Sequence, residues 1–268
     1  MTALYSSTTW EYHRRKLAGL AGAAVALVTM SVAAVPVAEE AKDPPVTRPA
    51  RGATVENLRR WLGELRDGDP EVRERARIDL MGIDREALDD LQRVVVEMRP
   101  LAPSQLVALE EIVAHVYLSS TSPDPEGGGF LGVRLATTGV EIAPGPGVRA
   151  EGMPVGVAIT SRLLGFDGYR MLQDGDVLLR LRTAKITKEF HQPMDLPSAV
   201  SSQPAGRTVI LEVLRRGELI RVPVMLSGKP EWAAVTSADH PFGSLEREEK
   251  ARAYWRERFA PLLDRGRQ

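Results

Sequence analysis

The side chains able to act as nucleophiles, bases or metal ligands are few and scattered in this chain of 268 residues. There is no cysteine, which excludes disulfides, thiolate nucleophiles and cysteine-ligated metal sites. The four histidines, His13, His115, His191 and His240, do not show a metal-ligand spacing such as two histidines one helical turn apart. We therefore expect neither a metal site nor a cofactor.

Two carboxylates, Asp174 and Asp176, flank Gly175 in the stretch LQDGDVLLRL at residues 172–181. Neighbouring carboxylates are able to share acid–base work. An Asp-Gly pair that leads into an apolar run is, however, the usual signal of a turn followed by a strand. The sequence favours this structural interpretation over catalysis.

The serines do not complete a hydrolase site either. Ser161 and Ser198 lack the glycines that frame a nucleophile elbow. His115 and His191 have no serine and aspartate partners in a triad arrangement. We expect no catalytic residues, and hence a protein that is not an enzyme.

The charges of the chain nearly balance, with 35 lysines and arginines against 36 aspartates and glutamates. Such a chain has no general attraction for polyanions, so we expect no nucleic-acid partner. Its charged residues alternate in sign along the segments that look helical, which is typical of solvated helix faces.

The N-terminus indicates export. Basic residues at 13–16 precede an uncharged, apolar segment at residues 17–38, which is long enough to cross a bilayer. Residues 1–38 are therefore either a cleaved signal peptide or an uncleaved membrane anchor. Either one places the rest of the chain in the cell envelope on the periplasmic side, anchored or secreted. Residues 39–53 are charged and proline-rich, as in a linker.

Residues 54–120 carry apolar side chains at helical spacing and predict a bundle of four helices. Thr54 is the expected N-cap of the first helix. Asp69 and Pro70 are the expected cap and first residue of the second, and Asp84 precedes the third. The segment at residues 69–95 resembles one HEAT-like helix pair. Because a single pair cannot bury its apolar face alone, we expect the bundle to pack on a neighbour.

After a linker at residues 121–129, rich in glycine, proline and serine, the apolar period changes to two, as in strands. Pro223 lies within the last such run and predicts an edge strand, because proline has no N–H for a ladder. Asp195 is the expected cap of a short helix. The pattern predicts an α+β protein, with a mostly β domain at residues 130–229 and a helix-bearing tail at 230–268.

Five pieces of the β region, in order, resemble a PDZ domain in the arrangement of bacterial HtrA-type envelope proteases. They are FLGV at 130–133, VGVAI at 155–159, LQDGDVLLRL at 172–181, MDLPSAV at 194–200 and PAGRTVILEVLRRGELIRVPVML at 204–226. The resemblance implies a partly open β-barrel with a short groove helix. The chain departs from the family at Arg182-Thr183, where Asn-Gly is frequent, and in a long insert at residues 137–154. The protease domain of that family has no counterpart here.

The resemblance implies that a peptide adds as an extra strand to a sheet edge, with its terminal carboxylate held by backbone N–H groups. Gly129 and Gly132 would let the carboxylate approach the backbone. Phe130 and Leu131 would line the pocket for the last ligand side chain. The implied peptide-binding residues are Gly129, Phe130, Leu131, Gly132, Val133, Arg134 and Leu135, and across the groove Leu196, Ala199, Val200 and Gln203.

The expected function is therefore that of a noncatalytic module which binds protein or peptide C-termini with apolar end residues. The apolar groove wall predicts this preference. Two alternatives remain open. One is a structural scaffold, similar in layout to the single-pass component of type II secretion systems. The other is an adaptor that delivers substrates to a separate envelope protease.

Overall fold

The computed structural model describes residues 53–119, 128–141, 155–234 and 242–264. Its helices and antiparallel strands make it an α+β protein, as the sequence predicts. None of the helices in these ranges is long and apolar enough to cross a membrane. The expected signal or anchor at residues 1–38 and nearly all of the expected linkers lie outside the described residues.

The predicted helix starts are confirmed. The Thr54 hydroxyl accepts a hydrogen bond from the Asn57 N–H at 3.2 Å, and the Asp69 carboxylate accepts from the Glu71 N–H at 2.8 Å. The third predicted helix is divided into a 3-10 turn and an α-helix. The first helices are α2 (Val55–Glu64), α3 (Pro70–Met81), η1 (Arg85–Ala87), α4 (Leu88–Glu97) and α5 (Pro103–Ser119).

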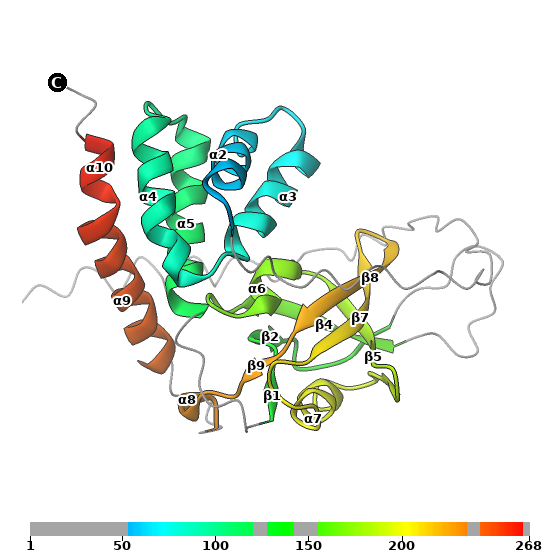
Figure 1. Cartoon of the computed structure of the whole chain (residues 1–268). Coiled ribbons are helices and arrows are strands. Elements are labelled where there is room, and N and C mark those ends of the chain that lie inside the picture. The colour runs from blue at the N-terminus through cyan, green and yellow to red at the C-terminus, as the bar shows by residue number, and fades with distance from the viewer. Residues whose placement is uncertain (1–52, 120–127, 142–154, 235–241, 265–268) are drawn as a thin grey trace, which may run out of the picture.

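The C-terminal helices return to these first helices. The chain ends in α9 (Phe242–Arg258) and α10 (Ala260–Asp264), which Figure 1 shows running beside α4 and α5. The rings of Trp255 and Phe259 stack with centroids 5.5 Å apart and belong to the same apolar core as Leu58 and Leu62. We call this group of helices, drawn from both ends of the described chain, the helical unit.

The strands form a β unit below the helices in Figure 1. Its main sheet has the order β2-β4-β5-β7-β8, β3 pairs with β4, β6 pairs with β5, and β1 pairs with β9. Short helices α6 (Asp167–Met171), α7 (Asp195–Ser201) and α8 (Glu231–Ala234) accompany them. The strands are β1 (Gly129–Phe130), β2 (Val133–Leu135), β3 (Val140–Glu141), β4 (Val155–Arg162), β5 (Val177–Arg182), β6 (Thr187–Glu189), β7 (Thr208–Arg215), β8 (Glu218–Met225) and β9 (Ser227–Gly228).

Pro223 lies in β8 at one end of the main sheet, so the predicted edge strand is confirmed. The predicted turn before β5 is also present, with Gly175 at φ +89°. Asp195 differs from the prediction, because it is the first residue of α7 and its side chain does not cap that helix. Its carboxylate accepts instead from the N–H groups of His191 and Gln192, at 2.8 and 2.9 Å, and so closes the loop before the helix.

Candidate peptide-binding edge

The loop of Leu131 and Gly132 joins β1 to the edge strand β2. Gly132 has φ +72°, a conformation that costs other residues about 1–2 kcal/mol. A β-carbon on Gly132 would also lie 2.3 Å from Cβ of Phe166. Only glycine fits this position, both for its backbone conformation and for the space available.

The backbone hydrogen bonds of this loop are incomplete. Gly129 donates its N–H to the Gln203 carbonyl at 2.7 Å, and the Gly132 carbonyl accepts from the Leu163 N–H at 2.7 Å. The N–H groups of Leu131 and Gly132 donate to no acceptor within the described ranges. Both residues are buried, and buried N–H groups without an acceptor are rare because each costs free energy. Two neighbouring donors of this loop thus lack an acceptor within the described ranges.

The strand that follows the loop, β2, has further N–H groups at its outer edge. Successive residues of an antiparallel strand direct their N–H and C=O groups alternately to its two edges. Gly132 bonds to Leu163 on the β4 side, so Val133 directs its polar groups to the opposite, outer edge. The register shifts by one residue before Leu135, and Ala136 then donates to β4 at 2.9 Å. Leu135 therefore also faces the outer edge, where the described sheet has no further strand beside β2.

The opposite edge of the main sheet is protected at the C-terminal end of β8. Leu226 donates to the Arg207 carbonyl at 2.8 Å, so alternation turns Met225 and Pro223 outward. Pro223 has no N–H, and the Met225 N–H donates to the Asp167 carboxylate at 2.7 Å. Strand addition is therefore favoured at β2 over β8.

The predicted apolar wall is assembled but closed. Leu131 belongs to the same core cluster as three residues of α7, namely Leu196, Ala199 and Val200. These four side chains are between 2% and 6% exposed. The structure thus brings the two sides of the predicted groove together, and a ligand side chain would have to part them.

Of the other predicted site residues, Val133 and Leu135 are half-buried and pack against this cluster, while Phe130, Arg134 and Gln203 lie around the loop. Phe130 turns away, and its ring packs edge-on against Phe166 with centroids 5.0 Å apart. The Gln203 side chain bonds to the Ser202 hydroxyl at 3.1 Å, while its carbonyl holds Gly129. Arg134 is exposed on β2. The alternation of neighbouring side chains explains why Phe130 and Leu131 do not share one pocket.

The carboxylates Asp174 and Asp176 have structural partners. Asp176 is almost fully buried and forms an ion pair with Arg215 at 2.8 Å, while it also accepts from the Gln173 N–H. Asp174 pairs with Arg162 at 2.7 Å. These contacts support the turn interpretation of this segment.

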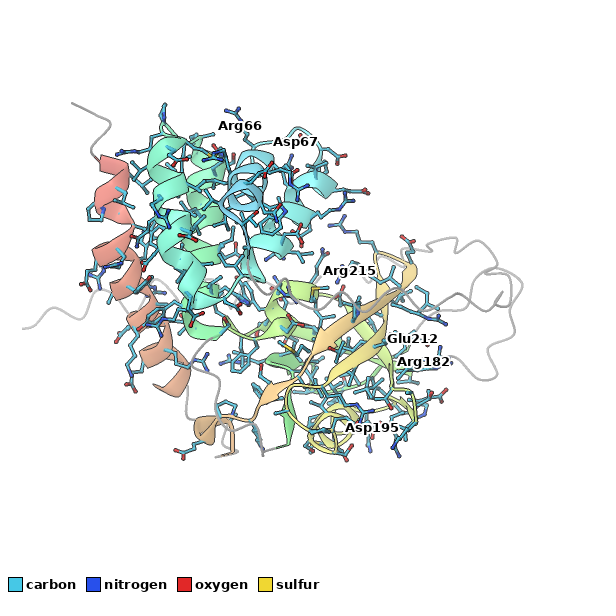
Figure 2. The ribbon with its side chains drawn as sticks, viewed as in Figure 1. Arg66, Asp67, Arg182, Asp195, Glu212 and Arg215 are labelled. Carbon is cyan, nitrogen blue, oxygen red and sulfur yellow. The ribbon has the colours of Figure 1, made fainter. Side chains whose placement is uncertain are left out.

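A buried carboxylate on the sheet was not foreseen from the sequence. Glu212 on β7 is 5% exposed and forms ion pairs with Arg182 at 2.9 Å, Arg180 at 3.3 Å and Arg221 at 3.7 Å. Figure 2 shows Arg182 and Glu212 side by side on the sheet. The alternation of β5 and the register of β7 with β8 bring these side chains to one face. That register is a tertiary property, so the local sequence carries no signal for it.

His115 of α5 is buried at the junction of the two units. Its Nδ1 accepts from the Gly165 N–H at 3.3 Å, and its ring lies 5.8 Å from that of Tyr169. Burial, with the nearby charges of Arg170 and Arg77, lowers the pKa of His115 to about 3, so the ring is neutral. Burial also raises the pKa of Tyr169 to about 12.

Histidines and acids do not assemble a metal centre in the part of the chain that the structure describes. In those ranges no three side chains of His, Asp or Glu gather closely enough to hold a metal ion. His191 is largely exposed and lies 3.7 Å from Glu189. Comparison with models of known protein families finds no match, and a search of curated proteins finds no similar sequence.

Proposed function

We propose that this protein is a noncatalytic peptide-binding module of PDZ type, exported to or tethered in the cell envelope. A partner peptide adds as a strand along the outer edge of β2. Its C-terminal carboxylate accepts hydrogen bonds from the N–H groups of Leu131 and Gly132. The observation that carries the proposal is this pair of unpartnered N–H groups at the start of an edge strand.

Three further features support the proposal. The N–H groups of Val133 and Leu135 face the outer edge of β2, where an added strand would pair. The cluster of Leu131 with Leu196 and Val200 supplies apolar surface for the last ligand side chain. Backbone N–H groups that converge in a loop attract an anion without a charged side chain.

The test compares peptides with apolar C-termini, each as a free acid and as an amide, by fluorescence polarisation with the full chain. Hydrogen bonds to a charged group contribute about 1.5–3 kcal/mol, so we expect the acids to bind at least about tenfold more tightly. Equal binding of acid and amide would contradict capture of a free C-terminus. No binding by either would contradict the peptide-binding function and favour a scaffold.

Two proline variants locate the binding edge. Leu135→Pro removes an outward N–H from β2 and should abolish binding, in the way that Pro223 protects β8. Leu219→Pro is the matched control, because Leu219 occupies an outward position on β8 and is 50% exposed. Leu135→Ala shortens the side chain but keeps the N–H, and it should retain most of the affinity. Loss of binding in Leu219→Pro but not in Leu135→Pro would place the peptide on the β8 edge and contradict the proposed site.

A further inference from the structure

Residues 163–170 connect β4 to α6 and include the first residues of α6; we call them the bridging segment. They pack against the loop of Leu131 and Gly132, which we call the peptide loop. The Leu163 N–H holds the Gly132 carbonyl at 2.7 Å. The Phe166 side chain fills the space where a Gly132 β-carbon would lie, and a β-carbon on Gly168 would lie 2.3 Å from the Leu131 carbonyl oxygen. Both loop residues with unpartnered N–H groups therefore rest on this segment.

The other side of the bridging segment is held by the helical unit. The Gly165 N–H donates to His115 of α5, and the Arg247 guanidinium of α9 lies 4.8 Å from the centre of the Phe166 ring. Arg77 of α3 donates to the Arg170 carbonyl at 3.2 Å. Three helices thus contact a stretch of eight residues whose opposite face supports the peptide loop.

The junction between the two units is not fully packed. An open pocket of about 400 Å³ lies against the bridging segment, between the helical unit and the end of β8 with β9. Its walls include Gly82, His115, Ser119, Gly165, Arg170 and Met225. The segment thus has space to shift if its contacts with the helices change.

We propose that the helical unit sets the affinity of the peptide loop through the bridging segment, with His115 and Phe166 as positioning residues. This inference rests on the proposed function. His115 does not contact the ligand; it fixes the Gly165 backbone, which in turn places Phe166 against Gly132. A second partner that binds the helices would then change peptide affinity without touching β2.

The test uses the full chain with two variants of His115. His115→Asn keeps an acceptor, Oδ1, close to the position of Nδ1, whereas His115→Leu removes it. Loss of the hydrogen bond from the Gly165 N–H to residue 115 should weaken binding of a free-acid peptide by about three- to tenfold. The ratio of acid to amide affinity should fall in His115→Leu and be retained in His115→Asn. The 1H–15N chemical shifts of the Leu131 and Gly132 amides in the free chain should move only in His115→Leu.

Leu58→Ala is the control for simple destabilisation, because Leu58 is fully buried in the helical core on α2. It should lower the melting temperature and leave the affinity ratio and both amide shifts unchanged. If His115→Leu behaves in the same way, His115 is structural only and the inference fails. If the unmodified chain does not distinguish acid from amide, the proposed function fails, and the amide shifts alone still decide whether His115 positions the loop.

Discussion

The Cβ atom of Phe166 lies 2.3 Å from the place that a β-carbon on residue 132 would take. Residue 132 has no room for a side chain, because the Phe166 side chain packs directly on the Gly132 backbone. The peptide loop and the bridging segment are therefore in contact through Phe166. Movement of either one is therefore passed to the other.

Alanine at residue 132 should cost more free energy of unfolding than alanine at a glycine that has positive φ but open space around it. Gly132→Ala adds a steric clash to backbone strain, and we expect a loss of about 3 kcal/mol. Gly175→Ala is the matched control, since Gly175 has φ +89° with open space around it, and its expected loss is about 1 kcal/mol. Urea unfolding followed by circular dichroism measures both values. Equal losses would show that Phe166 yields to the new methyl group.

His115 should make folding stability depend on pH. Its pKa is about 3 in the folded chain and 6.5 when unperturbed, so between these values the unfolded chain binds a proton that the folded chain does not. The free energy of unfolding therefore falls as the pH drops below about 6.5 and continues to fall towards pH 3. His115→Asn should show a shallower decline over this window than the unmodified chain. Thermal melts at pH 7, 5.5 and 4 test this, and parallel declines would contradict it.

Removal of the Glu212 carboxylate should destabilise the β unit. Glu212→Gln leaves Arg180, Arg182 and Arg221 clustered without their shared anion, and we expect a loss of about 2 kcal/mol. Arg182→Gln removes one partly exposed member only and should cost less than about 1 kcal/mol. Chemical unfolding at low and high salt distinguishes the two variants. A Glu212→Gln variant as stable as the unmodified chain would show that the ion pairs of Glu212 make no net contribution to the free energy of unfolding.

The C-terminal helices should be essential to the helical unit. Phe259 is fully buried, and Phe259→Ala should lower the free energy of unfolding by about 3–5 kcal/mol. Leu245→Ala on α9, the helix just before Phe259, changes a side chain that is 49% exposed and should cost less than about 0.5 kcal/mol. Differential scanning calorimetry of both variants gives the comparison. Similar melting temperatures would mean that α9 packs without stabilising the helices it covers.

Features that depend on neighbouring residues in the sequence were predictable. Thr54 and the pair Asp69-Pro70 begin helices because their own side chains and fixed φ favour a first turn. Pro223 lies on an edge strand because its missing N–H excludes it from a central one. Gly132 was expected to be a glycine so that a carboxylate could approach the backbone, and in the structure it has φ +72°.

Features that depend on distant residues were not predictable. The sequence predicted a helix in the tail at residues 230–268, but it did not indicate that Trp255 and Phe259 pack into the core of the first helices. His115 has no local signal of burial beside Gly165, which is 50 residues away. Asp195 was expected to cap α7, but its carboxylate accepts from two N–H groups of the preceding loop instead.

The protection of β8 by Pro223 and Asp167 also limits how copies of this chain could join. A fibre built by edge-to-edge pairing needs two open edges on each copy, and the stretch of β8 around Pro223 and Met225 is blocked for such pairing. Among the described strands, contact between copies through their sheets is therefore favoured as a pair of β2 with β2, which closes after two. If the proposed function holds, the same asymmetry predicts one peptide ligand for each chain.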